Sequence, residues 1–433
     1  MKPIRSGVAR LRGIESSAVT AATLTSAAER GDDGEPPSGL AHVATASFLA
    51  SRAAPSAGFW VALAGGVALA RVGEKRGARV GYGASIAAML QTVAIMGPAR
   101  FGVPLTQALT APLLGRLEAA RVSALRQVLA CAAIRLLHTT LTVAVFVLVL
   151  AGGVGAWTDS YDAIARRLPL LPEGTEAALI VTGTSLLAWA AFASTVQVIV
   201  YRRALRLWPA AGAPAAGAKT AEDVEPARRF DPRAIALAGA IAFCLLLAST
   251  TVPLLGAVSA WLALAWLAAN SDRSVVPAGL AIAAALAGGV LLVTAIGGAG
   301  LAVALRRAAR AGLLVLVATW IRAAAGAGGL REVSRRLLGR LRALPAVPEA
   351  SRVLDELGSG RQLGDAARSV ARVLSAAPKR PLALLDSVLA WVAAEAARFR
   401  PAAQPKQLAL RARARDAMLV LAAALPAAVL VLG

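Results

Sequence analysis

The sequence predicts an all-α fold: a polytopic helical integral membrane protein with seven to nine transmembrane helices and a helical cytoplasmic platform. Hydrophobic residues make up 58% of the 433 residues, only 16% are charged, and the mean hydropathy is +0.65. A water-soluble fold of this length cannot enclose so much apolar surface. Several apolar runs reach the roughly 17 residues that a spanning helix needs. They are rich in Ala and Leu and lack the alternation of barrel strands, so helices are expected.

Six apolar runs are strong candidates for spans, and three more are weaker because they are short or rich in glycine. The strong candidates are 125–153, 176–201, 234–250, 252–269, 275–296 and 301–321; the weaker ones are 53–70, 78–97 and 417–432.

Loop charge predicts the orientation of these spans, because cytoplasmic loops carry an excess of Lys and Arg. The loop after the first strong run has more acidic than basic residues and is predicted outside, whereas the loop 202–233 holds seven Lys/Arg and is predicted inside. Residues 322–416 contain 18 Lys/Arg and 8 Asp/Glu, which predicts a cytoplasmic segment. The net charge of +22 therefore indicates an inner (plasma) membrane, multi-pass protein rather than one that binds nucleic acid.

The basic segment 71–79 does not fit this alternation, since the loop after residue 97 is basic as well. Either 53–70 or 78–97 is re-entrant or interfacial, or one basic loop lies outside. The sequence leaves these alternatives open.

Composition divides the chain into four parts. Residues 1–52 form an N-terminal amphipathic arm, predicted as a surface helix, a turn and a second helix, and 53–208 form an N-terminal membrane domain. Residues 209–228 are rich in Pro, Ala and Gly and read as a flexible linker. Residues 229–433 form a C-terminal membrane domain, with coupling-type helices at 322–416.

The chain has few residues of the types that usually carry out catalysis. It has two cysteines and two histidines, far apart in sequence, and no nucleotide-binding or zinc-protease motif. We therefore expect no enzyme activity, no cofactor and no metal site, and no cleaved signal peptide. Within the predicted spans, Arg135 and His138 share a helix face, and Gln197 could line a polar path. Alternatively, Arg135 snorkels to the cytoplasmic boundary and Gln197 makes an interhelical hydrogen bond.

Residues 329–344 are the most informative stretch. Leucines and one valine recur on one helical stripe, while Arg331, Arg335 and Arg340 lie among the arginines of the remaining surface. Such a helix is suited to lie on anionic lipids of the inner leaflet. Prolines end it, and further helices are predicted at 349–357, 361–376 and 382–399.

The second half of the chain, roughly 229–433, resembles the transmembrane (T) component of energy-coupling factor transporters, of the cobalt-uptake membrane subunit type. The resemblance rests on Phe230-Asp231-Pro232-Arg233 before a group of short apolar helices, and on the run 300–344 that leads into the amphipathic segment. It implies a scaffold that links cytoplasmic ATP-binding-cassette (ABC) ATPase subunits to a substrate-binding membrane subunit for a vitamin or metal ion.

In that family, Ala-Arg-Gly signatures of the coupling helices meet the ATPase. The nearest matches here are Ala371-Arg372-Val373 and Ala412-Arg413-Ala414, neither of which has the glycine. Arg372 and Arg413, with the three arginines of the stripe, are the expected partner-binding residues. The alternative is a non-transport membrane scaffold that recruits a cytoplasmic partner through its basic helices. The N-terminal half is not covered, and its three or four spans are too few for a six-helix substrate-binding subunit.

Overall fold

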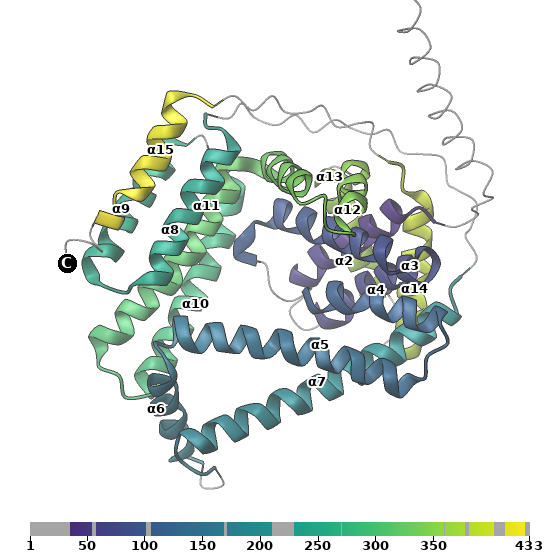
Figure 1. Cartoon of the computed structure of the whole chain (residues 1–433), viewed down its shortest axis with the longest axis horizontal. Helices are drawn as coiled ribbons and strands as arrows, with labels where there is room; N and C mark the ends of the chain where they lie inside the picture. The colour runs from purple at the N-terminus through teal and green to yellow at the C-terminus, as the bar shows by residue number, and fades with distance from the viewer. Residues whose placement is uncertain are drawn as a thin grey trace, which may run out of the picture. The chain divides into compact units, whose positions relative to one another are not determined.

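The computed structural model describes residues 35–53, 58–100, 105–168, 171–209, 229–269, 271–358, 360–376, 381–401 and 412–428. Every regular element in these ranges is a helix, so the predicted all-α class is confirmed for them (Figure 1). The described helices belong to one compact unit, Pro36–Gly433. The first part of the predicted arm, residues 1–34, and nearly all of the predicted linker lie outside the described residues, and the predicted division into domains stays a prediction.

The described residues form fourteen α-helices and three short helices. They are α2 (Pro37–Ala53), α3 (Gly58–Met96), α4 (Leu105–Ala119), α5 (Ala124–Val145), α6 (Val154–Ala165), α7 (Thr175–Arg206), α8 (Pro232–Ala248), α9 (Val252–Ala268), α10 (Val276–Ile296), α11 (Leu301–Arg340), α12 (Val347–Glu356), α13 (Gly360–Ala376), α14 (Pro381–Arg398) and α15 (Ala414–Ala424), with the short helices η1 (Pro98–Arg100), η2 (Phe146–Leu150) and η3 (Arg273–Val275).

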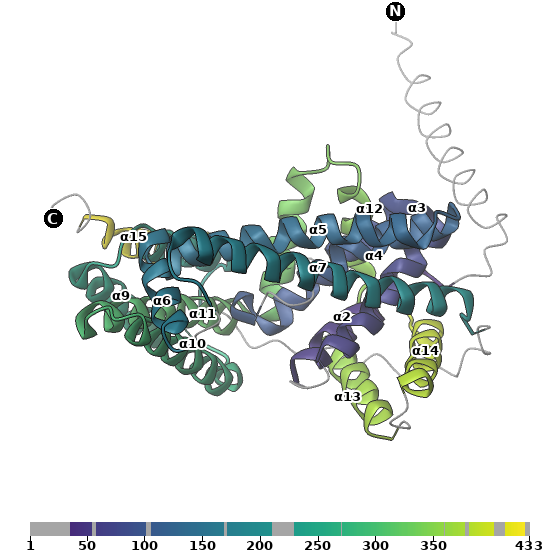
Figure 2. The same ribbon diagram turned by 90° about the horizontal axis from the view of Figure 1, so that it is seen from below.

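Four of the described helices are long and apolar enough to cross a membrane: Ala124–Leu150, Thr175–Arg206, Arg273–Ile296 and Leu301–Arg340. Helices α8 and α9 are apolar but have 17 residues each. The finer prediction of seven to nine spans is therefore not confirmed. Helices α5 and α7 pack against each other at one end, diverge, and are joined at the other end by α6, as Figures 1 and 2 show. Both expose large apolar side chains, such as Leu137 and Phe192, along their length.

The basic segment 71–79 is a sharp turn inside α3. Gly77 has φ +82° and ψ 169°, a conformation that residues with a Cβ rarely adopt. A Cβ built on Gly81 would lie 3.0 Å from the Cα of Gly73, although eight residues of straight helix span about 12 Å. The two arms of α3 thus fold back on each other. This reversal puts both ends of α3 on the same side of the turn, and α3 is not among the four long apolar helices.

The first core lies around α2, α3 and α4, and α12, α13 and α14 also contribute to it. Helix α2 lies where the second helix of the arm was predicted, and it is buried on nearly all sides; the surface helix predicted before the turn lies outside the described residues. The reason lies in its small residues. Ala, Ser, Gly and Thr let neighbouring helices approach from every direction without forming an apolar stripe that sequence patterning could detect. Gly65, for instance, packs against Phe48 and Ala44.

The second core joins α8, α9, α11 and α15, with Trp261 edge-on to Trp320 at a centroid distance of 5.3 Å. Asp231 caps α8 by accepting a hydrogen bond from the Arg233 backbone N–H. Burial raises the pKa of the Asp231 carboxyl, but hydrogen bonds from Arg233 outweigh it, so this pKa lies below its ordinary value. Asp416 accepts from the backbone N–H groups of Asp231 and Arg413, at 2.8 and 2.7 Å, and so fastens α15 to the start of α8.

Helices α12, α13 and α14 confirm the predicted helical pieces at 349–357, 361–376 and 382–399 to within about two residues. They follow α11, which bends at Gly326 (φ +66°, ψ 167°) and ends at Arg340, four residues before the predicted end. Their apolar faces point inward: Val353 and Leu354 of α12 and Leu363 and Val370 of α13 are buried.

Candidate functional site

A buried polar cluster joins α4, α5 and α7, and it contains the three polar residues that the sequence placed within spans. Arg135 is only 3% exposed, so its side chain is turned into the protein. Its Nη2 donates to Gln197 Oε1 at 2.7 Å, and its Nε donates to Ser194 Oγ at 3.4 Å. Arg135 therefore meets α7 rather than extending along its own helix to an end.

Helix α4 completes the cluster. Gln197 Nε2 donates to Thr110 Oγ1 at 2.7 Å, and Thr110 in turn donates to the carbonyl of Thr106. Thr106 Oγ1 lies 3.3 Å from His138 Nδ1, where the donor depends on the tautomer of the imidazole. The structure thus links Arg135, His138 and Gln197 through hydroxyl and amide groups.

This cluster has two chemical capacities. Its hydrogen bonds hold three helices in register, as interhelical polar contacts do in membrane proteins. It also places a guanidinium charge among neutral partners, since none of its hydrogen bonds joins Arg135 to a carboxylate. A buried cation in an apolar helix is by default a candidate functional group, and it could attract an anionic group that enters between α4, α5 and α7.

The five arginines expected to bind a partner lie on three elements, and the structure gives them different roles. Arg331 donates from Nη2 to the carbonyls of Leu354, Asp355 and Leu357, the last at 3.1 Å. These carbonyls lie at the end of α12, where no further helical turn satisfies them. Arg331 thus fastens α12 to α11.

Arg335 and its neighbour Arg336 are held by Glu332, at 2.9 and 2.8 Å. Arg340 is exposed, and so are Arg372 on α13 and Arg413 before α15. Within the described residues, the structure records no ion pair for these last three. No hydrogen bond brings the five arginines together.

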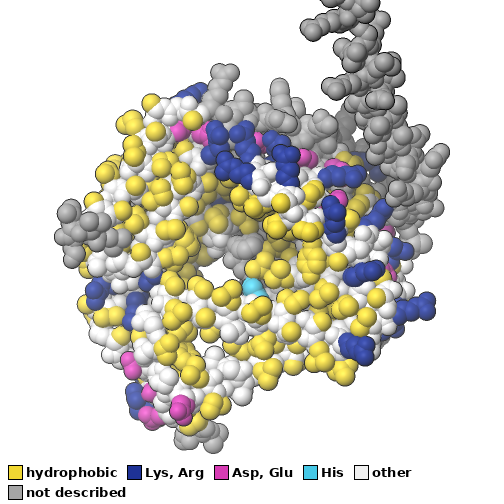
Figure 3. Space-filling view, in the orientation of Figure 1, with side chains coloured by type: hydrophobic (Ala, Val, Ile, Leu, Met, Phe, Trp, Pro, Cys, Tyr) yellow, Lys and Arg dark blue, Asp and Glu magenta, His cyan; other side chains and the backbone are white. Residues whose placement is uncertain are grey.

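The end of α11 also exposes apolar residues. Leu337, Leu341 and Leu344 are 53%, 42% and 54% exposed, whereas Leu330 of the same predicted stripe is buried. Lys and Arg side chains gather near hydrophobic ones in the upper part of the face seen in Figure 3, over α12 and the end of α11. This mixture is typical of a surface that meets a partner or lipid headgroups.

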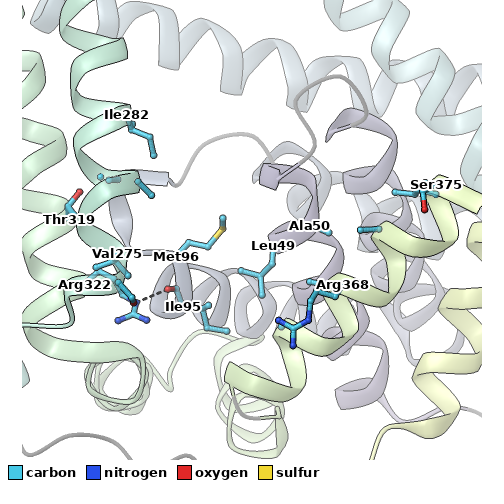
Figure 4. Close-up of a pocket in the computed structure, with 18 residues that line it drawn as sticks. Leu49, Ala50, Ile95, Met96, Val275, Ile282, Thr319, Arg322, Arg368 and Ser375 are labelled. Carbon is cyan, nitrogen blue, oxygen red and sulfur yellow. Dashed lines mark hydrogen bonds between the residues drawn. The ribbon is translucent and has the colours of Figure 1, made fainter.

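A cavity of about 640 Å³ separates α10 and α11 from α2 and α13 (Figure 4). Arg322 lies on one wall, where its Nε donates to the Ile95 carbonyl at 2.6 Å and its guanidinium is 3.7 Å from Asp272. Arg368 lies on the opposite wall, on α13. The rest of the lining is mainly apolar.

Sequence reasoning missed Arg310 and Arg322. Arg310 lies inside the run 301–321 that was counted as a span, so the rule that singled out Arg135 could also have found it. Arg322 stands directly after that run, and its partners are distant in sequence. Among the described residues, no group of three or more His, Cys, Asp or Glu side chains could hold a metal ion.

No protein-family model, no curated protein and no solved structure matches the chain.

Proposed function

We propose that the protein is a multi-pass scaffold of the inner (plasma) membrane that recruits a cytoplasmic protein through its basic helices. The resemblance of its second half specifies the form of this assembly: an energy-coupling factor importer of a vitamin or metal ion. The recruited partners are then ABC ATPase subunits, with a separate substrate-binding membrane subunit alongside.

The observation that carries the proposal is the layer formed by the end of α11, α12 and α13. The apolar faces of α12 and α13 are buried against α2 and α3, and Arg331 fastens α12 to α11. The outward side of this layer carries exposed arginines, including Arg340, Arg361 and Arg372. A folded layer presents these charges in a fixed arrangement, which favours recognition of an acidic surface over loose attraction.

Two accounts of these charges predict different mutational patterns. Attraction to anionic lipids is worth about 1 kcal/mol per residue near the surface, adds up gradually and is screened by salt. Docking to a protein is concentrated in a few buried contacts. A single substitution therefore distinguishes the two.

The test is copurification of the tagged, full-length protein in gentle detergent, with nucleotide-binding ATPases identified by mass spectrometry. We expect Arg372→Ala or Arg413→Ala alone to remove the ATPase while membrane insertion is unchanged. Arg167→Ala, an exposed arginine in the loop predicted outside, is the matched control and should retain it.

The same experiment can reject the importer. If the wild-type protein brings down no ATPase, the non-transport scaffold replaces the importer, as the missing glycines after Arg372 and Arg413 would favour. If single substitutions have no effect on any recruited protein and only multiple ones loosen binding to anionic vesicles, the basic layer serves lipid attraction and the recruitment proposal fails.

A further inference from the structure

A second basic site lies beyond the C-terminal end of α5, the helix that carries Arg135. A cavity of about 370 Å³ is lined by the end of η2 and Gly152, by residues 247–250 at the end of α8 and directly after it, and by the first turns of α11. Arg306, Arg307 and Arg310 of α11 all line it, and no lining residue is acidic. Three guanidinium groups thus share one cavity without a carboxylate from the described chain.

Arg310 is built into this site. It is 5% exposed, its Nη1 donates to the Val149 carbonyl at 2.6 Å, and its Nη2 donates to the Leu247 carbonyl at 2.8 Å. Both carbonyls lie at helix C-terminal ends, where partial negative charge accumulates. The Nε–H of Arg310 is buried and has no partner. The carbonyls of these two helix ends therefore offset part of the positive charge of Arg310, while its buried Nε–H still lacks an acceptor.

Arg306 and Arg307 add two charges that no described acidic group neutralises. Arg306 Nε reaches only the carbonyl of Ala302 in its own helix, at 3.3 Å. Arg307 lies against Gly152, where a built Cβ would be 2.7 Å from its Cζ and 2.9 Å from its Nε. Gly152 has φ +87°, so a glycine both forms this bend and leaves room for the guanidinium.

We propose that this cavity binds a phosphate group. Guanidinium groups match phosphate oxygens with paired hydrogen bonds, and the hydroxyl of Thr250 in the lining can supply a further donor. A phosphate offers more acceptor oxygens than a carboxylate and can use donors that converge from α8 and α11. The phosphate belongs either to a phospholipid headgroup or to a soluble phosphate compound.

The location is compatible with both sources. The cavity lies at the beginning of α11 and the end of α8, and Gly152 in its lining borders the loop that the charge pattern predicts to be outside. This site is independent of the proposed recruitment surface, which lies at the other end of α11.

The test uses the purified full-length protein in a neutral detergent and has two arms. Sodium phosphate, against sodium chloride at equal ionic strength, should raise the unfolding temperature of the wild type in a saturable way if a soluble phosphate compound is the ligand. If the ligand is a lipid, the protein should selectively retain phosphatidylglycerol. Native mass spectrometry detects this after incubation with vesicles of phosphatidylglycerol or of phosphatidylcholine.

Arg306→Gln and Arg307→Gln should weaken whichever binding is seen by about tenfold or more, as loss of a charge-assisted hydrogen bond does. Both residues are partly exposed, and an unchanged unfolding temperature in chloride shows that a variant has folded. Gly152→Ala should also weaken binding by displacing Arg307, while Arg167→Gln should leave it unchanged. The proposal is overturned if the wild type responds in neither arm, or if both glutamine variants respond like the wild type.

Discussion

Lowering the pH should destabilise the protein through His42, a residue of α2. His42 is 3% exposed, its ring centroid lies 4.7 Å from that of Phe399, and its Nδ1 has no partner. Burial lowers the pKa of this imidazole from 6.5 to about 4. The unfolded chain therefore binds a proton more readily than the folded chain between these two values.

The sign and size of the change in folding stability follow from this difference in pKa. Because the folded pKa is the lower one, the contribution of His42 to stability is complete above pH 6.5 and is lost as the pH falls toward 4. At pH 5 the loss amounts to about 2 kcal/mol, and below pH 4 it levels off at about 3 kcal/mol.

The assay is unfolding of the detergent-solubilised protein between pH 7.5 and pH 5, for the wild type and His42→Asn. The carboxylates contribute equally to both proteins, so the difference between their pH slopes isolates His42. We expect His42→Asn to lose about 2 kcal/mol less than the wild type over this interval. His138→Asn, which removes the other histidine, should retain the contribution of His42. Equal slopes for the wild type and His42→Asn would refute the reasoning.

Three further outcomes are expected. Gly66→Ala should destabilise the protein by about 1–3 kcal/mol in chemical unfolding, because a Cβ there would overlap the hydroxyl of Tyr201; Tyr201→Phe should restore part of the loss, and no rescue would contradict this contact. Arg331→Ala should cost about 1–3 kcal/mol by the same measurement, because the carbonyls at the end of α12 lose their donor; a neutral result would mean that water replaces it. Finally, in a background without the native cysteines, Asp159→Cys should react with an impermeant thiol reagent in intact cells and Ala343→Cys should not, and equal labelling would refute the predicted orientation.

The sequence predicts the helices well and their packing poorly. Proline and glycine breaks fix the ends of α12, α13 and α14, because these residues act locally on the backbone. The burial of α2 has no such local signal, since Ala41, Ala44 and Ser47 are as compatible with a surface as with a tight core. That α12 and α13 cover α2 and α3 depends on contacts between segments some 270 residues apart, such as Gln91 Nε2 with the Gly358 carbonyl.

In the candidate site too, the sequence predicts features within one helix but not the contacts between helices. Spacing alone put Arg135 and His138 on one face of a helix. It could not tell that Gln197 of α7 and Thr110 of α4 would meet that face, because helix pairing is set by side-chain fit across the chain. Arg331 illustrates the converse: its place in an apparent basic stripe predicts a free surface charge, yet its guanidinium reaches the carbonyls of α12.

The hydrogen bond that Asp416 accepts from the backbone N–H of Asp231 constrains when the second core can form during synthesis. The backbone N–H of Asp231 emerges from the ribosome 185 residues before the carboxylate that accepts its hydrogen bond. Until Asp416 is made, that N–H lacks the acceptor that it has in the folded protein. The second core, to which α15 contributes Leu419 and Ala423, is therefore completed only after residue 416 has been made. A nascent chain stalled before residue 416 would leave the backbone N–H of Asp231 without this acceptor, a feature by which a quality-control protease could recognise it.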